Sequence, residues 1–319
     1  MQRKTEKLVP SGSQTGFDKF RKSLRTQREL WIISIPIILW VLLFAYYPMY
    51  GILMAFFDYT PGKEIFQCPF VGLKHFKSFL TNPAIWQLLR NTLAMSALSL
   101  TIGFIAPIIF ALLLNEVGHL KIKKLVQTVS YLPHFISWVV TGSMVYMMLS
   151  SEGILNDMLL GLGLTDKAIP FLTQGSYYWT IYIIVNVWKG IGWSSIIYLS
   201  SISGVDDELY QAGAIDGLGR WGMAMHITLP SIAPTILILW ILGIGGILNA
   251  GFDYHLIIGN SATQAYWDVI DTYTYRYGVQ QGYYSMSTAV SLMKSVIGFA
   301  LVVLTNWISK KTTDMSILY

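Results

Sequence analysis

Leu229–Ala250 reads LPSIAPTILILWILGIGGILNA and contains no charged residue. This run decides the class of fold, because an α-helix needs roughly 20 apolar residues to cross the hydrocarbon core of a bilayer. Of the 319 residues, 54% are hydrophobic and 12% are charged, which is about half the charged share of a soluble domain. The sequence therefore predicts an all-α integral membrane protein and excludes a chain of soluble domains.

Five further apolar runs bring the number of predicted membrane spans to six. The six spans are Trp31–Phe57, Asn91–Leu114, Leu125–Leu149, Tyr177–Ile202, Leu229–Ala250 and Met286–Ile308. The first run is too long for the core of a signal peptide, so we interpret it as a retained helix. Prolines in or beside the spans predict kinks or irregular ends, and these are Pro36, Pro48, Pro107, Pro230 and Pro234.

The basic residues indicate how the spans are oriented. With the N-terminus in the cytoplasm, the inside segments carry fourteen Lys and Arg and the outside loops carry six. Because an excess of Lys and Arg is typical of cytoplasmic loops, we expect both termini inside the cell. The formal charge of +5 is thus explained by membrane topology, and no nucleic-acid partner is expected.

The predicted spans divide the chain into four parts. These are a basic cytoplasmic tail (1–30), a first transmembrane helix with an external loop (31–90), a five-helix core (91–311) and a cytoplasmic C-terminal tail (312–319). The core contains a cytoplasmic loop, 203–228, between spans four and five. The outside segments Asp58–Arg90 and Gly251–Ser285 are long and aromatic, which suits contact with an external partner.

Two short helices are predicted within the cytoplasmic loop. Asp206 and Asp207 are good N-terminal caps for the first helix, and Gly217 can end it in a left-handed conformation. In the second, Leu218, Trp221 and Met225 lie on one face and lead to Pro230.

The first of these helices carries the small residues Ala212, Gly213 and Ala214. Small side chains permit close approach by another protein. A helix that rests on the lipid surface is the alternative, and the residues alone do not separate the two interpretations.

This loop resembles the EAA signature of permease subunits in binding-protein-dependent ABC importers. That signature has Glu-Ala-Ala, Asp-Gly and Leu-Pro at set intervals, and the matching residues here are Gln211-Ala212-Gly213, Asp216-Gly217 and Leu229-Pro230, with Pro234 beyond. The similarity covers roughly Asn91–Lys311. It implies a type I importer permease, with six transmembrane helices and a coupling helix that docks in a cleft of a cytoplasmic ATPase.

The resemblance implies that six residues couple the chain to the ATPase: Glu208, Gln211, Ala212, Gly213, Asp216 and Gly217. Two of them depart from the signature, since Gln211 stands in place of Glu and Gly213 in place of the second Ala. Gln keeps the length and the hydrogen-bonding capacity of Glu but lacks its charge. Glu208, one turn earlier, is an alternative source of that charge.

The resemblance also implies the partners. They are a second, homologous permease subunit, two copies of the ATPase, an external solute-binding protein and the lipid of a bacterial inner membrane. The chain lacks a Gly-x-x-x-x-Gly-Lys-Ser/Thr loop, so it is not expected to be an enzyme. ATP and Mg are expected on the partner ATPase, and no cofactor on this chain.

Four motifs resemble, within this family, the subgroup that imports aldouronate, alginate and related oligosaccharides. They are Tyr47-Pro-Met-Tyr-Gly51, Val71-Gly-Leu-Lys74, Asp268-Val-Ile-Asp-Thr-Tyr273 and Lys294-Ser-Val-Ile-Gly298. The resemblance implies a carbohydrate substrate.

The charges within the predicted spans are all basic. Lys189 lies in span four and Lys294 in span six, whereas no Asp or Glu falls in any span. Because ionisable residues at this depth usually face a cavity, a subunit or a ligand, we hypothesise a cationic path for an acidic saccharide. Pairing with a second permease, pairing with loop acids such as Asp253, and snorkelling remain alternatives.

Aromatic side chains complete the predicted substrate path. Trp188, Trp193, Tyr254 and Tyr275 have flat faces that suit a sugar, and interfacial belts are the more common explanation for such residues. Arg276 is included in the same path.

Other classes of membrane protein and site are weaker alternatives. An ion- or proton-driven secondary transporter normally shows intramembrane carboxylates or paired broken helices. A membrane glycosyltransferase would carry an acidic metal motif. The five His residues and Cys68 lack metal-site spacing, and Asp206-Asp207-Glu208 is better explained by helix capping, so no metal and no catalytic residue are predicted.

Overall fold

The computed structural model describes residues 26–313, and these are mainly helical, with one isolated β-bridge between Phe57 and Phe70. The chain forms two units, divided between Leu53 and Met54. The loop after the first span lies in the second unit. The predicted tails, 1–30 and 312–319, lie mostly outside the described residues.

The described residues contain five continuous helices that are long and apolar enough to cross a membrane. They are Arg28–Phe56, Ile85–Asn115, Gly175–Ile202, Arg220–Gly245 and Tyr284–Lys311. They confirm five of the six predicted spans, with shifted ends. The predicted span Leu125–Leu149 is wrong as a single helix, because Leu120–Phe135 and the helical segment that begins at Trp138 meet at 101°.

The first unit contains the first span. Its helix α2 (Arg28–Val41) continues through a π-helical turn, Leu42–Tyr46, into the 3-10 segment Tyr47–Phe56, within which the units divide. No residue of α2 is buried. A helix that is apolar on all sides and buries no face of its own is typical of a membrane span.

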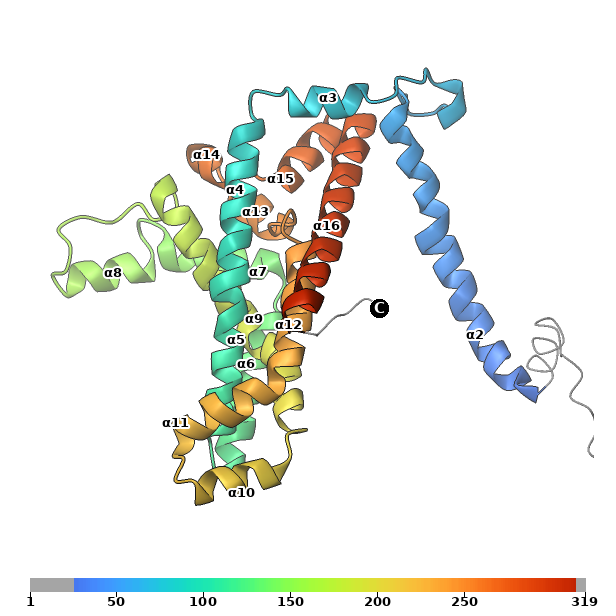
Figure 1. The fold of residues 1–319 in the computed structure, drawn as a ribbon. Helices are drawn as coiled ribbons and strands as arrows, with labels where there is room; N and C mark the ends of the chain where they lie inside the picture. The colour runs from blue at the N-terminus through green and yellow to red at the C-terminus, as the bar shows by residue number, and fades with distance from the viewer. Residues whose placement is uncertain (1–25, 314–319) are drawn as a thin grey trace, which may run out of the picture. The chain divides into compact units, whose positions relative to one another are not determined.

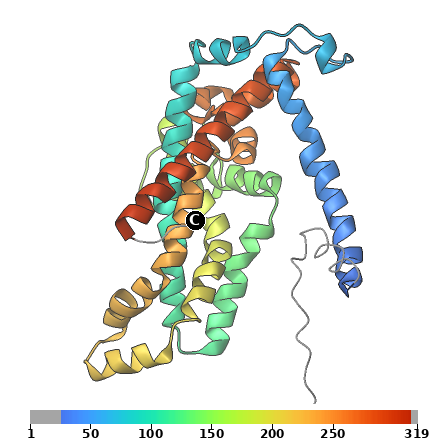
Figure 2. The ribbon, with the colours of Figure 1, turned by 45° about the vertical axis from the view of Figure 1, so that its right-hand side comes forward.

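The second unit is a bundle of helices (Figures 1 and 2). Its α-helices are α3 (Lys74–Leu80), α4 (Ile85–Leu98), α5 (Phe104–Asn115), α6 (Leu120–Phe135), α7 (Trp138–Leu149), α8 (Ile154–Gly161), α9 (Gly175–Ile202), α10 (Asp207–Ile215), α11 (Arg220–Met223), α12 (Leu229–Gly245), α13 (Phe252–Ile258), α14 (Gln264–Trp267), α15 (Ile270–Thr274) and α16 (Tyr284–Thr313). Helices α4 and α5 form one column, with α3 at one end and α10 and α11 at the other.

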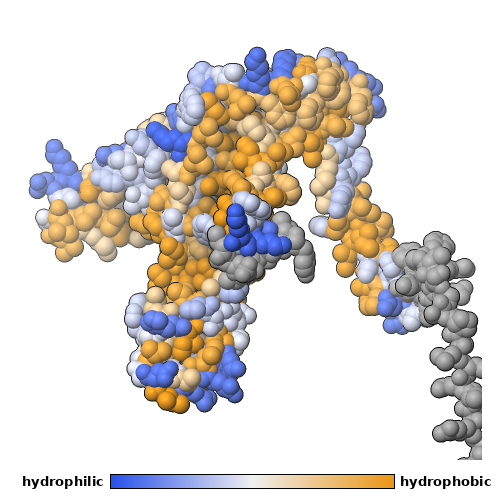
Figure 3. Space-filling view, viewed as in Figure 1, coloured by the Kyte–Doolittle hydropathy of each residue, from blue (hydrophilic) through white to orange (hydrophobic). Residues whose placement is uncertain are grey.

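The surface of this unit matches a membrane orientation. Hydrophobic residues cover the α4–α5 column, and hydrophilic residues gather around α3 and around α10 and α11 (Figure 3). Lipid therefore suits the middle of the bundle and water its two ends.

Three π-helical segments each lie just before a proline. Leu42–Tyr46 precedes Pro48, Ser99–Gly103 precedes Pro107, and Ala224–Thr228 precedes Pro230. A proline cannot donate to the carbonyl four residues earlier, and its ring crowds that carbonyl. A wider turn relieves the crowding without ending the helix, so the predicted irregularities occur inside continuous spans.

Two predicted external loops are corrected by the structure. Helix α4 begins at Ile85, so the first loop ends before Arg90. The segment Gly251–Ser285 folds into the bundle, where Ile258, Trp267 and Ile270 are buried. Part of this segment is therefore core, and its exposed residues remain available for contact with a partner.

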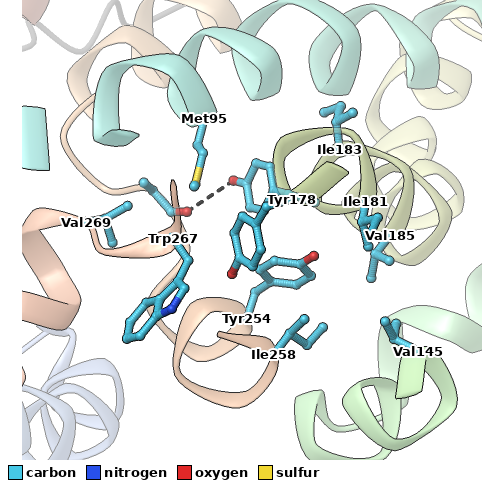
Figure 4. Packing of buried hydrophobic residues seen from close by; sticks show 12 residues of the cluster. Met95, Val145, Tyr178, Ile181, Ile183, Val185, Tyr254, Ile258, Trp267 and Val269 are labelled. Carbon is cyan, nitrogen blue, oxygen red and sulfur yellow. Dashed lines mark hydrogen bonds between the residues drawn. The ribbon is translucent and has the colours of Figure 1, made fainter. Parts of the chain in front are cut away.

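An aromatic cluster holds α13 against α9 at the centre of the unit (Figure 4). Tyr178 on α9 shares a 2.9 Å hydrogen bond with His255. Tyr182, one turn later, donates to the Ala250 carbonyl at 3.1 Å, and Tyr254 packs edge-on against Tyr182 at 5.1 Å. Hydrogen bonds from these side chains thus hold the irregular segment before α13 in place. The hydrocarbon of the bilayer could not supply those hydrogen bonds.

The break in the third span is closed by Lys189 of α9. The Lys189 ammonium donates to the carbonyls of Pro133 (3.1 Å), His134 (3.2 Å) and Ile136, which end α6. It also lies 5.1 Å from the ring centre of Trp138, the first residue of α7. The last carbonyls of a helix lack partners within it and attract a cation, so the buried charge of Lys189 is balanced by this chain.

A close crossing of α6 and α9 places Lys189 at the break. A Cβ atom added to Gly192 would lie 2.2 Å from the Ser130 carbonyl oxygen. One residue later, the ring of Trp193 stacks on His134 with centroids 4.4 Å apart. The absence of a side chain at Gly192 therefore lets the two backbones approach.

We predict that Gly192→Ala lowers the thermal unfolding midpoint of the purified protein by several degrees, because the backbone of α6 must move away. Gly190→Ala on the same helix is the matched control, since a Cβ atom there meets nothing within 4 Å. Equal midpoints for the two variants would contradict the close crossing.

We also predict that Lys189→Met lowers the unfolding midpoint, because three carbonyls at the break lose their donor and each unsatisfied buried group costs about 1–3 kcal/mol. Lys167→Met, at an exposed position, should leave the midpoint unchanged. An unchanged midpoint in Lys189→Met, combined with loss of transport of an acidic saccharide alone, would instead assign Lys189 to the substrate path.

Candidate functional site

The first candidate site is α10 in the loop 203–228, and this helix begins and ends as predicted. The Asp206 side chain accepts a hydrogen bond from the Glu208 backbone N–H at 3.0 Å. Gly217 has a φ of +79°, a left-handed conformation that glycine adopts without strain. The helix is thus defined by its own local sequence.

Side chains of the following segment hold α10 in place. Tyr210 shares a 3.0 Å hydrogen bond with Thr228. Gly213 is buried, and a Cβ atom there would lie 2.5 Å from Cδ1 of Ile227. This corrects the prediction that Gly213 meets the ATPase, because its bare face is used within the chain; Ile227 also explains why glycine stands at this position.

The other predicted coupling residues remain on the outside of α10 and its C-terminal turn. Glu208, Gln211, Ala212, Asp216 and Gly217 are all exposed. Two large apolar side chains accompany them, Leu209 at 49% exposed and Ile215 at 87% exposed. An exposed surface that mixes apolar and acidic groups is typical of a docking site for another protein.

The second short helix of the loop is continuous with the next span. Helix α11 runs through the π-helical turn Ala224–Thr228 into α12, and Arg220–Gly245 is one apolar helix. The predicted second helix thus leads to Pro230 and the next span, and no break separates it from that span. Because no flexible joint separates them, a displacement beside α10 passes directly into α12.

The second candidate site is a polar pocket of about 510 Å³ between α12 and α16. Its polar lining consists of Asn249, Asp271, Ser291, Lys294 and Ser295. Lys294 forms an ion pair with Asp271, and its side chain is 10% exposed. Of the alternatives left open for Lys294, the structure thus shows pairing with an acid of the predicted loop, and that acid is Asp271 in place of Asp253.

Two motifs that are distant in sequence meet at this pocket. Asp271 lies on α15 and Lys294 on α16. At the pocket, α12 and α16 cross closely, since a Cβ atom on Gly298 would lie 2.5 Å from the Gly245 carbonyl oxygen. The Lys294-to-Gly298 motif thus supplies both the cation and the close crossing.

The remaining predicted path residues are not brought together with Lys294. Trp188 and Trp193 are on α9, 41% and 46% exposed, and Trp193 stacks on His134. Tyr254 is 1% exposed and part of the core, which corrects its placement in a path. Tyr275 packs edge-on against Phe252 at 5.1 Å.

Arg276 forms an ion pair with an acid that is buried within the protein. It pairs with Asp268, which is buried, and it lies 5.8 Å from the ring centre of Trp267. Thr272 donates to the other Asp268 oxygen at 2.7 Å. The contacts of Arg276 therefore hold α14 and α15 together.

An ion pair in the loop after the first span provides a contrast. Lys74 donates to Asp58 at 2.9 Å with both side chains at least half exposed. This hydrogen bond holds the pKa of Asp58 below its ordinary value. Water screens such a pair, so it contributes little to stability.

Sequence reasoning missed Asn249, Asp271, Ser291 and Ser295 as site residues. Asp271 was counted as part of an external loop, although α15 folds beside α16. A signal was present for the two serines, because residues 291, 294 and 295 share one face of a helix and form a polar stripe in an apolar span.

Comparisons with known proteins agree with this architecture. Residues 103–314 match the family model described as "Binding-protein-dependent transport system inner membrane component". The chain is 41% identical to Protein LplB of Bacillus subtilis, over 91% of each chain. It is 42% identical to the Polygalacturonan/rhamnogalacturonan transport system permease protein YteP of the same organism, over 89% of this chain and 88% of that one.

Two solved structures have the same fold along almost the whole chain. One is described as a bacterial ABC transporter involved in the import of the acidic polysaccharide alginate, with a TM-score of 0.84, 38% identity and coverage of 92% of this chain and 99% of that one. The other is a bacterial alginate ABC transporter in complex with alginate pentasaccharide-bound periplasmic protein, with a TM-score of 0.83, 37% identity and coverage of 93% and 99%.

No comparison supports an ion-driven transporter or an enzyme. The family match extends through α10, α12 and α16, so it includes both candidate sites. The chain belongs to the family of binding-protein-dependent transport system inner membrane components and is a permease subunit of an ABC importer.

Proposed function

We propose that this permease forms one half of the path for an oligosaccharide that carries carboxylate groups. The observation that carries the proposal is the similarity, over about nine-tenths of the chain, to permeases named for polygalacturonan, rhamnogalacturonan or alginate transport. The polar pocket at Lys294 supports it, because it provides a cation and hydroxyl groups inside an apolar bundle.

The proposed complex contains this chain, a second homologous permease, two cytoplasmic ATPase subunits and an external binding protein. It lies in the inner membrane of a bacterium with both termini of this chain inside. The basic residues near the chain ends support this orientation. ATP and Mg bind to the ATPase subunits.

Helix α10 is the proposed coupling helix. Its exposed side carries Ile215 and Leu209 beside Glu208, and its inner side is fixed to the start of the fifth span by Tyr210 and Gly213. Binding of the ATPase to that side displaces α11 and α12 together. For ATP to drive transport, the inward-open and outward-open states must differ in affinity for the nucleotide-bound ATPase.

The proposed function is tested by uptake into proteoliposomes that hold the complete complex and its binding protein. We expect ATP-dependent accumulation of trigalacturonate or trimannuronate, and no accumulation after ATP is withheld. Import of the neutral trisaccharide maltotriose without either acid would contradict the carboxylate-bearing substrate, and accumulation without ATP would contradict the coupling.

We predict that Ile215→Ser lowers ATP-dependent uptake roughly tenfold, because an apolar residue near the centre of an interface contributes much of the binding energy. Less ATPase should co-purify, while the unfolding midpoint of the permease stays unchanged, since the Ile215 side chain is 87% exposed. Leu164→Ser is the control, at a 67% exposed site after α8. Normal ATPase binding by Ile215→Ser would exclude α10 as the docking helix.

A further inference from the structure

The Lys294–Asp271 ion pair borders an open polar pocket in the middle of a membrane span. Lys294 lies about 15 Å along α16 from Tyr284, which is half the thickness of the hydrocarbon core. Charges at this depth are expensive and are seldom placed there for stability alone. Their position needs a reason beyond holding α15 to α16.

We propose that Lys294 recognises the substrate by exchanging carboxylates, so that a sugar carboxylate replaces Asp271 as the partner of its ammonium during passage. This inference rests on the proposed import of an acidic oligosaccharide. It assigns the pocket at Lys294 as the specificity site of this permease for uronate residues.

The first support comes from comparison with the other cations of the bundle. Lys189 donates to three backbone carbonyls at the end of α6. Arg276 is paired with an Asp268 side chain that is 6% exposed and also bonded to Thr272. The carboxylate that pairs with Lys294 is 24% exposed and lines the pocket. A ligand can therefore reach the Lys294–Asp271 pair without dismantling the core.

The second support is the chemistry of the pocket wall. An ammonium has three N–H donors, and Asp271 Oδ1 is the acceptor that the described residues provide for Lys294. Ser291, Ser295 and Asn249 are exposed beside it, and hydroxyl and amide groups both donate and accept hydrogen bonds. This set matches a sugar ring that carries several hydroxyl groups and one carboxylate.

The third support is energetic. A sugar carboxylate offers the Lys294 ammonium the same charge-assisted hydrogen bond as Asp271, whereas an uncharged sugar would have to compete with Asp271 without a charge of its own. The displaced Asp271 carboxylate stays in the pocket, where it is 24% exposed and can be hydrated. Because Asp271 returns when the substrate leaves, the site holds a uronate long enough to select it and still releases it.

The pocket is also connected to the coupling loop. Helix α12, which lines one wall near Gly245, is continuous with α11 and with the turn beside α10. A rigid helix transmits a displacement at one end to the other. Movement of the ATPase would therefore change the width of the pocket and the distance between its wall and Lys294.

The test uses the complete complex in proteoliposomes, with trigalacturonate and its fully methyl-esterified form, both at concentrations that saturate the binding protein. The variant is Lys294→Gln combined with Asp271→Asn, which removes both charges but leaves no unpaired ion. Its unfolding midpoint and ATPase rate are measured alongside uptake, so that a loss of folding or of assembly is distinguished from a loss of recognition. The control is Lys74→Gln combined with Asp58→Asn, which neutralises the exposed external pair.

We expect the Lys294 and Asp271 double variant to lower uptake of trigalacturonate roughly tenfold and to change uptake of the ester less than twofold. The external control should transport both as the wild type does. If the double variant imported trigalacturonate as the wild type does, or lost uptake of both saccharides equally, the proposed carboxylate exchange would be wrong. The Lys294–Asp271 ion pair would then have a structural role only. Failure of the wild-type complex to import acidic saccharides would instead contradict the proposed function itself.

Discussion

Hydrocarbon offers no hydrogen bonds, so each irregular turn in this bundle must find its partners within the protein. At the end of α6, the ammonium of Lys189 donates hydrogen bonds to three carbonyls that have no helical partner. Before Pro107 and Pro230, a π-helical turn accommodates the proline ring without ending the helix. These internal contacts position the aromatic core and both candidate sites.

The spans and the coupling loop were predictable because their signals are local. A long uncharged run such as Leu229–Ala250 has one physical explanation, and the cap at Asp206 and the turn at Gly217 depend on neighbouring residues only. The bend after α6 was missed because Leu125–Leu149 is uncharged and long enough for one span, although Pro133 near the end of α6 and the cap Ser137 of α7 are local signals of a break. The lysine that binds the carbonyls at the bend lies more than fifty positions later, and periodicity cannot reveal that contact.

The candidate sites differ in the same way. Glu208 and Gln211 were placed correctly on an exposed helix, but Gly213 was not, because its neighbour Ile227 belongs to the next helical segment. Lys294 was recognised as unusual from its depth alone. Its partner Asp271 was overlooked, since a rule that counts acids within spans cannot recognise a loop that folds back into the bundle.

The crossing of Gly245 and Gly298 has a mechanical consequence. Where two helices meet through large side chains, interlocked knobs resist sliding, and a shift must jump from one groove to the next. Here the Gly298 face lies against the Gly245 backbone, and the Gly245 face is filled by Val302, whose Cγ2 atom would lie 2.4 Å from an added Cβ atom. A larger side chain at either glycine would therefore push α12 away from α16 and widen the polar pocket that lies between them.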